Sequence, residues 1–161
     1  MTTSVSLAFD EKESPSSPVI IGREYFSPSL LTELRPLIFA NHKASESQAP
    51  LDPQWDGFLA LQDAGALCLI VARVNYVPVG YVAHAALINQ SSGEIEAKCL
   101  AVYVEPQHRT LALRLVSASE EAAMAAGAKT IVYSVPHLSR AGAFFEAVGY
   151  RCAELVMEKR L

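Results

Sequence analysis

The chain has 161 residues, of which 51% are hydrophobic and 19% charged, with a formal net charge of −4. This composition is typical of one folded globular domain and excludes a disordered or low-complexity chain. The sequence has no basic run, no apolar run of bilayer length and no N-terminal leader, which argues against nucleic acid, membrane and secretion. The cysteines Cys68, Cys99 and Cys152 are well separated, which favours free thiols in a reducing cytoplasm over disulfides or a metal set.

Residues 1–18 end in a polar stretch rich in serine and proline, so we expect a flexible arm before a single domain over 19–161. Residues 19–21 indicate a short first strand. Ser27, followed by a proline, predicts a helix start, and apolar residues recur at helical spacing as far as Ile38. Pro36 lies inside this pattern and predicts a kink or two short helices. The polar residues 41–51 predict an exposed loop that can shape a substrate entrance.

A second helix is predicted to begin with Asp52 as its capping residue and to stop at Gly65. Its apolar residues should face the core and its late polar residues should face solvent. We expect burial at Trp55, Phe58 and Leu59 and exposure at Gln62 and Asp63.

Three apolar runs of strand length follow, over 66–74, 79–88 and 94–104, with turn-like segments at 75–78 and 89–93. Their short connections predict an antiparallel meander. A helix over 110–126, ended by Gly127, and a strand over 131–135 then form a crossover that places parallel strands side by side. Ser139 is predicted to cap a short helix to Ala147, and Gly149 opens a last strand region to residue 161.

The connection between the third apolar run and the long helix carries the clearest functional signal. Pro106 breaks the strand after Val104, and a helix is predicted to begin near Arg109 or Thr110. An abrupt turn of this kind directs unpaired helix N–H groups and the positive end of the helix dipole at one point. Such a point suits an anion, and above all a phosphate.

The segment Gln107-x-x-Thr110-x-Ala112 resembles the acyl-CoA signature of the GNAT superfamily of N-acetyltransferases, with Thr110 where the first glycine is usual. A second stretch, Arg140-Ala141-x-x-Phe144-Phe145-x-x-x-Gly149-Tyr150, is similar to the family's late helix and turn, with Leu138 in place of an asparagine. Residues 65–81 also resemble acetyltransferase-like proteins of bacteriophages and prophages. The resemblance spans about 19–161 and implies an α/β (α+β) GNAT fold. In that fold a mixed central sheet has an antiparallel meander, then a strand–helix–strand crossover, and helices on both faces.

The resemblance implies acetyl-CoA, or another acyl-CoA, as the cofactor. The amides of 109–113 would bind its pyrophosphate, and Arg109 and Arg114 would add charge-assisted bonds unless they are merely solvated. Thr110 would either crowd the phosphate with its Cβ or bond it through its hydroxyl. The end of the third strand would bind the pantetheine arm. The full expected set is Ala101, Val102, Tyr103, Val104, Gln107, His108, Arg109, Thr110, Leu111, Ala112, Leu113 and Arg114.

For the general base the resemblance points to Glu96, one strand length before the motif, although a glutamate there can equally be a solvated strand end. His84 is either a hydrogen-bonded, semi-buried histidine or a proton carrier. Phe145 occupies the place of the family's usual tyrosine acid and has no proton to give. Tyr133, Ser139 or water are the candidate substitutes, or the thiolate leaves unassisted. His137 follows a strand and is a further candidate for lining the site, and no metal site is indicated.

The implied function is transfer of an acetyl group from acetyl-CoA to a primary amine by direct attack, without a cysteine intermediate. The acceptor is either a small molecule or a protein or peptide amine, and a homodimer is possible. One alternative is a catalytically weakened module of the same fold that binds CoA or a protein, which Thr110 and Phe145 favour. A binding domain of another α/β fold is a third alternative.

Overall fold

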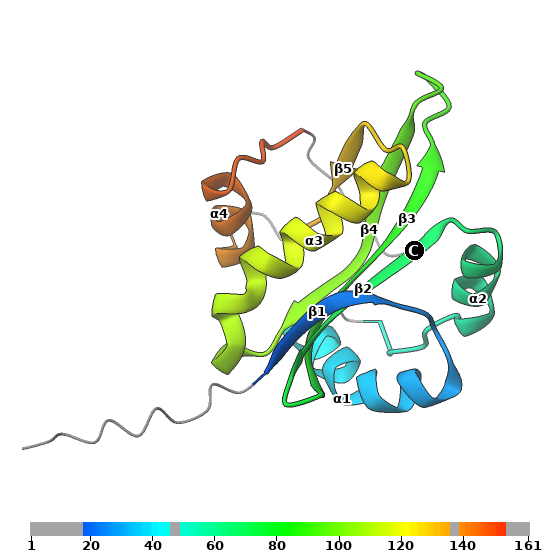
Figure 1. The fold of residues 1–161 in the computed structure, drawn as a ribbon. Helices are drawn as coiled ribbons and strands as arrows, with labels where there is room; N and C mark the ends of the chain where they lie inside the picture. Colours follow the sequence, from blue (N-terminus) through cyan, green and yellow to red (C-terminus); the bar gives the residue numbers. More distant parts are fainter. Residues whose placement is uncertain (1–17, 46–48, 136–138, 154–161) are drawn as a thin grey trace, which may run out of the picture.

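A computed structural model describes residues 18–45, 49–135 and 139–153. The predicted arm before residue 18, His137 and the last strand region beyond residue 153 lie outside these ranges. The described chain forms one sheet with the strand order β1-β2-β3-β4-β5 (Figure 1). The strands are β1 (Val19–Glu24), β2 (Leu67–Val74), β3 (Val77–Ile88), β4 (Ile95–Val104) and β5 (Thr130–Val132).

The strand pairing agrees with the meander and the crossover expected from the sequence. From β1 to β4 each strand is antiparallel to the next, and β5 joins β4 in parallel. The β2–β3 connection is shorter than expected, because Asn75 and Tyr76 form a two-residue turn with φ values of 50° and 67°. Gly127, at φ 84°, follows the crossover helix α3 (Ala112–Ala125) as predicted.

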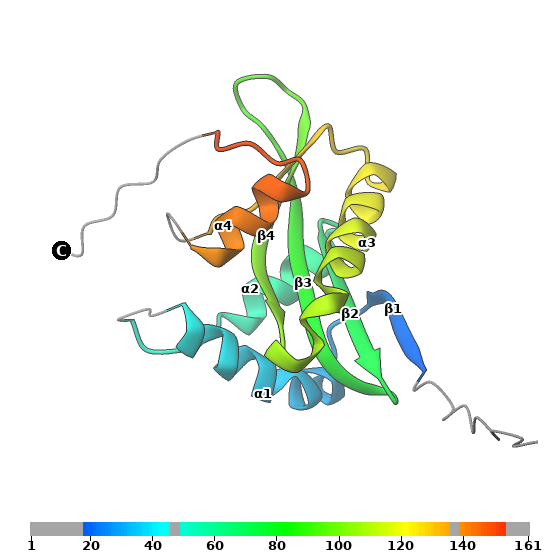
Figure 2. The same cartoon turned by 90° about the vertical axis from the view of Figure 1, so that its left-hand side faces the viewer.

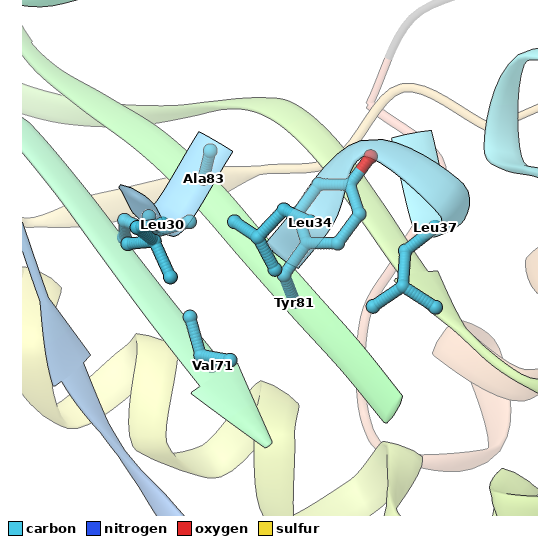
Figure 3. Packing of buried hydrophobic residues seen from close by; sticks show 7 residues of the cluster. Leu30, Leu34, Leu37, Val71, Tyr81 and Ala83 are labelled. Atoms are coloured by element: carbon cyan, nitrogen blue, oxygen red, sulfur yellow. The ribbon is translucent and has the colours of Figure 1, made fainter. Parts of the chain in front are cut away.

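Helices cover both faces of the sheet, as expected for this fold (Figures 1 and 2). Helices α1 (Pro28–Ala44) and α2 (Trp55–Asp63) lie on one side, and α3 and α4 (Arg140–Ala147) lie on the other. Successive strand residues point to opposite faces, so the core is divided into two layers. Leu69, Val71 and Tyr81 pack against α1, as Figure 3 shows for part of this layer, whereas Ile70 and Val82 pack against α3.

Helix α1 is longer than the sequence predicts. Ser27 Oγ accepts a hydrogen bond from the Leu30 N–H at 3.2 Å, which confirms the predicted start. The helix then runs as one element through Pro36 to Ala44, so the predictions of two short helices and of a loop from residue 41 are wrong. An interior proline costs about 3 kcal/mol in an isolated helix. Here Leu34 and Leu37, on either side of it, are 1% and 3% exposed, so tertiary burial offsets that cost.

Helix α2 begins later than predicted. It starts at Trp55 after Gln54, and Asp52 is not its capping residue. Trp55 and Phe58 contact the Phe26 ring, with centroid distances of 6.5 and 5.7 Å. Two predicted orientations are wrong. Leu59 is 38% exposed, and Gln62 points inward, where its amide bonds both the N–H and the carbonyl of Phe26.

Candidate functional site

Strands β4 and β5 diverge soon after they meet, and this opening is the centre of the candidate site. They pair through three residue pairs only, from Glu96↔Thr130 to Lys98↔Val132. Beyond that point β5 ends, whereas β4 continues to Val104. The edge of β4 over 99–104 that faces away from β3 is therefore left without a neighbouring strand among the residues that the structure describes.

A β-bulge lies where the pairing with β5 stops. Ala83 is opposite Ala101 and His84 is opposite Cys99, and both strands are fully described. Leu100 therefore has no opposite residue on β3. A bulged residue leaves the ladder and bends its strand. Sequence reasoning missed Leu100, because the hydrophobic pattern of 95–104 carries no sign of a register shift. The peptide groups of Leu100 are thus placed at the mouth of the opening.

The backbone of β4 beyond the bulge alternates between β3 and the opening. The Glu105 N–H donates to the Val79 carbonyl at 2.9 Å, so Glu105 and Tyr103 direct their backbone groups at β3. In an antiparallel ladder the residues between them direct theirs the other way. The amides and carbonyls of Val102 and Val104 therefore face the opening. Of the four strand residues expected to hold a cofactor, Ala101 and Tyr103 pack their side chains against the α1 layer.

The turn after β4 is a 3₁₀ segment, η1 (Pro106–Leu111), and α3 starts only at Ala112. The predicted helix start at Arg109 or Thr110 is therefore too early. Residues 109–111 instead form a 3₁₀ turn between His108, whose φ of −113° and ψ of 16° are not helical, and the α-helix proper. The His108 N–H donates to the Glu105 carbonyl at 2.9 Å, and the Ala112 N–H donates to the Arg109 carbonyl. Part of the expected row of amides is thus engaged within the turn.

The N-terminus of α3 nevertheless keeps anion-binding features. Leu111 precedes the helix, and within the described chain no side chain caps this end. Arg109, Thr110 and Arg114 are exposed beside it, which fits a charged ligand. The backbone at position 110 does not require a glycine. Among the described non-glycine residues only Asn75 and Tyr76 have a positive φ, so Thr110 has an ordinary negative φ.

Two predicted residues of the motif have other partners. Gln107 Nε2 donates to a Glu105 carboxylate oxygen at 2.9 Å, on the exposed surface. Leu111 is 9% exposed and belongs to the core beneath α3. Leu113, by contrast, is 52% exposed. The side chains of Gln107 and Leu111 are therefore committed within the chain, and any ligand would meet the backbone of Leu111.

Glu96 is half-buried on β4, opposite Leu87 on β3 and Thr130 on β5. Cys99 packs in the α3 layer, so by alternation Ala97 shares that face and Glu96 points to the other face. Glu96 belongs to the first of the three β4–β5 pairs. It therefore lies on the α1 side of the sheet, close along β4 to the point where the opening begins.

His84 is on the opposite face from Glu96. It is 1% exposed, and its Nδ1 is 3.0 Å from Ser119 Oγ on α3. Burial lowers the pKa of His84, and the nearby Arg23 cation lowers that pKa further. The structure does not bring His84 and Glu96 together, and it agrees with the alternative of a hydrogen-bonded, buried histidine.

Tyr133 is the first residue after β5 and lies at the start of the opening, half-buried. Its hydroxyl donates to Ser119 Oγ at 3.2 Å, and its ring centroid is 4.4 Å from that of Phe145. Burial raises the pKa of Tyr133 to about 12, so the phenol stays protonated at neutral pH. Ser139, a second candidate acid, has its Oγ engaged as the cap of α4, where it accepts from the Gly142 N–H at 3.1 Å.

Other site classes find no support in the described residues. No group of three histidine, cysteine, aspartate or glutamate side chains is placed there to hold a metal ion. None of the helices in the described ranges is long and apolar enough to cross a bilayer.

Comparison with known proteins bears directly on this geometry. Residues 31–150 match the model of the acetyltransferase (GNAT) family. No curated protein matches the sequence. Among solved structures, the chain is similar to a ribosomal-protein-alanine N-acetyltransferase from Brucella melitensis biovar Abortus 2308, with 20% identity and a TM-score of 0.71 over 89% of this chain and 98% of that one.

Two aminoglycoside acetyltransferases are also similar in fold. AAC(6')-Iy, solved with the bisubstrate analogue CoA-S-monomethyl-acetylneamine, is 18% identical over 90% of this chain and 99% of its own, with a TM-score of 0.69. The enzyme meta-AAC0020 from an uncultured soil metagenomic sample, solved with sisomicin, is 16% identical over 89% of this chain and 95% of its own, with a TM-score of 0.68. The family model spans most of the sequence and the strand order fits the same fold, so this chain belongs to the acetyltransferase (GNAT) family.

Proposed function

We propose that this chain transfers an acetyl group from acetyl-CoA to a primary amine by direct attack, at the opening between β4 and β5. The observation that carries the proposal is a coincidence of three features. These three features follow one another along the chain: the end of the β4–β5 pairing, the bulge at Leu100 and the uncapped start of α3. As a GNAT protein it is an N-acetyltransferase, and acetyl-CoA supplies the activated acyl group.

The residues of the opening fit a long donor that is polar at intervals. The outward amides and carbonyls of Val102 and Val104 offer alternating donors and acceptors to a pantetheine-like arm. Arg109 and Arg114, exposed beside the start of α3, offer charge-assisted bonds to a pyrophosphate. The Leu100 N–H, at the bulge, is the group that we assign to stabilising the acyl oxygen as negative charge develops on it.

Two side chains are assigned to proton transfer. We assign to Glu96 the removal of the proton that the acceptor nitrogen must lose, since it is a half-buried carboxylate near the opening. We assign to Tyr133 the proton that the departing sulfur gains, because Phe145 has no proton to give and its ring packs against Tyr133. In the balance, the C–S bond breaks, a C–N bond forms, and one proton leaves nitrogen while another reaches sulfur.

The acceptor is proposed by class only. The net charge of −4 mildly favours a cationic amine. Two of the similar structures hold aminoglycoside-related ligands, and a third is named for ribosomal-protein alanine. We therefore propose a small-molecule amine or the amine of a protein or peptide, and we would screen sisomicin and a peptide with N-terminal alanine first.

A second function, a CoA-binding or protein-interaction module without turnover, has one observation in its favour. Two amides of the turn after β4 are engaged, those of His108 and Ala112. Glu105, just before this turn, also carries a carboxylate, which accepts a hydrogen bond from Gln107. A phosphate would have to compete with this carboxylate for the same local positive potential.

Two measurements separate these functions. Acetyl-CoA at about a hundredfold over its dissociation constant should stabilise the fold by about 2.7 kcal/mol, well beyond ATP. Release of free CoA with an amine acceptor then distinguishes the enzyme from the module. Glu96→Gln should lower kcat by about 10² to 10⁴-fold, whereas the exposed Glu94→Gln should not. Equal turnover by Glu96→Gln and wild type would remove Glu96 as the base.

A further inference from the structure

A chain of hydrogen bonds runs beneath α3 from the middle of β3 to the start of the β4–β5 opening. Tyr133 Oη donates to Ser119 Oγ at 3.2 Å, and Ser119 Oγ lies 3.0 Å from His84 Nδ1. Ser119 is 0% exposed and His84 is 1% exposed. Two polar side chains, from α3 and β3, are thus sealed inside an apolar layer and joined to the half-buried Tyr133, which stability alone does not favour.

The end of this chain at His84 costs free energy. His84 Nε2 is buried and has no hydrogen-bond partner among the residues that the structure describes. If Ser119 donates to Nδ1, then Nε2 carries an unpaired N–H. If Nδ1 donates to Ser119, then Nε2 is an unpaired acceptor. Either arrangement leaves one buried polar atom unsatisfied, and a hydrophobic side chain at position 84 would avoid this.

The other end of the chain reaches the opening. Lys98↔Val132 is the last β4–β5 pair, so Cys99 and Tyr133 are the first residues past it on the two strands. Both pack in the layer beneath α3. Around the phenol stand Cys99 from β4, Glu120 from α3 and Tyr150 after α4, and the Tyr150 hydroxyl donates to Glu120 at 2.5 Å. Ser119, together with Tyr150, therefore fixes where the Tyr133 hydroxyl sits relative to the opening.

The surroundings of the imidazole are also defined. Cys68 on β2 and Cys99 on β4 are its cross-strand neighbours, and the cation of Arg23 on β1 lowers its pKa. Neither thiol gives Nε2 a hydrogen bond. Within the described chain, Ser119 is thus the one side chain that shares a hydrogen bond with the imidazole of His84.

We propose that Ser119 and His84 are positioning residues, which hold the Tyr133 hydroxyl where it can give its proton to the departing sulfur. This rests on the proposed function. For this step His84 Nδ1–H donates to Ser119 Oγ and the Ser119 hydroxyl turns to donate to Tyr133 Oη, which frees the phenol proton for the sulfur. The Tyr133 O–H bond then breaks as the S–H bond forms, and the phenolate regains a proton from water. His84 orients the Ser119 hydroxyl, Ser119 orients the phenol, and neither touches the substrates.

The first test compares Ser119→Ala with Ser117→Ala, two positions earlier on α3 and half-buried, as the matched control. Wild-type turnover and acetyl-CoA binding are measured first, so that failure of the proposed function is seen separately. We expect Tyr133→Phe to lower kcat by about 10²-fold or more. Ser119→Ala should lower kcat about tenfold or more with the dissociation constant of acetyl-CoA unchanged. An unchanged kcat for Ser119→Ala in a wild-type enzyme that turns over would overturn the proposal.

The second test uses position 84, where stability and catalysis should move in opposite directions. His84→Leu removes the unsatisfied atom, and Ser119 can turn its hydroxyl to a carbonyl of its own helix. We expect the melting temperature to rise by about 2 to 4 °C while kcat falls. His84→Asn keeps a polar atom near the place of Nδ1 and should retain more of the wild-type kcat than His84→Leu. A lower melting temperature with unchanged kcat in both variants would mean a purely structural histidine and would refute the positioning role.

Discussion

A substitution at Gly80 should test how packing between β3 and β4 supports the candidate site. It lies on β3 opposite Val104. A Cβ added there would stand 2.9 Å from the Tyr103 carbonyl oxygen and 3.1 Å from Val104 Cγ2. The oxygen is backbone and cannot swing aside, so the end of β4 must shift. Overpacking of this kind costs about 1–3 kcal/mol, or about 2 to 12 °C in melting temperature for a chain of this size.

The control for Gly80→Ala is Gly22→Ala on the edge strand β1. A Cβ at Gly22 would meet no described atom within 4 Å, and Gly22 has no positive φ. This variant should be neutral or stabilised by about 0.4–1 kcal/mol, since alanine restricts the unfolded chain.

Thermal denaturation followed by circular dichroism measures the stability difference, and calorimetric titration measures acetyl-CoA affinity. Because Val102 and Val104 present their backbone to the opening, Gly80→Ala should also weaken acetyl-CoA binding. Equal melting temperatures for the two alanine variants would refute the packing argument. A destabilised Gly80→Ala variant with normal affinity would show that this end of β4 does not hold the donor.

Three further predictions concern stability. Leu34→Ala should cost about 2–5 kcal/mol in urea unfolding, because Leu34 is 1% exposed on the face of α1 that packs against the sheet. A loss below 1 kcal/mol would mean that the helix repacks around the gap. Arg73→Met should cost about 1–2 kcal/mol, because Arg73 bonds Glu24 through Nε at 2.7 Å and Nη2 at 2.9 Å and Glu33 through Nη1 at 2.7 Å; high salt should shrink this difference, and no shrinkage would exclude an ionic origin. Burial raises the pKa of the Cys99 thiol from 9.0 to about 12, so the folded state keeps a proton that the unfolded state loses. The stability that this proton contributes is complete below pH 9 and is lost as pH rises towards 12. Cys99→Val should therefore lose less of its urea midpoint than wild type between pH 9 and 12, and an equal loss in both proteins would contradict a contribution from the Cys99 thiol.

Much of the fold could be predicted, because it follows from local signals. The apolar runs gave the three meander strands, and Ser27 and Ser139 marked the starts of α1 and α4 through caps that the structure contains. Gly127 marked the end of α3. Errors arose where tertiary packing overrode a local preference. Pro36 stays inside a helix because its neighbours are buried, and the side chain of Gln62 turns inward because the backbone of Phe26 offers it two partners.

The site was harder to predict, because it depends on register and on distant contacts. The motif around Gln107 located the turn, but the 3₁₀ segment that precedes α3 has no sequence signal. The bulge at Leu100 exists only in the pairing of β3 with β4. The contact of His84 with Ser119 joins residues 35 positions apart. A sequence read one segment at a time therefore finds the candidate residues but not which of them meet.

The position of β1 in the sheet has a consequence for how the molecule assembles. Strands β2, β3 and β4 are joined by short turns, so their pairing closes small loops and can begin early. Glu24 of β1, in contrast, pairs with Leu69 across the whole of α1 and α2. Closing so long a loop is slow and is favoured only once the meander exists. Strand β1 should therefore join after the meander and, as an edge, should open before it, so its amides should exchange with solvent deuterium before those of β3.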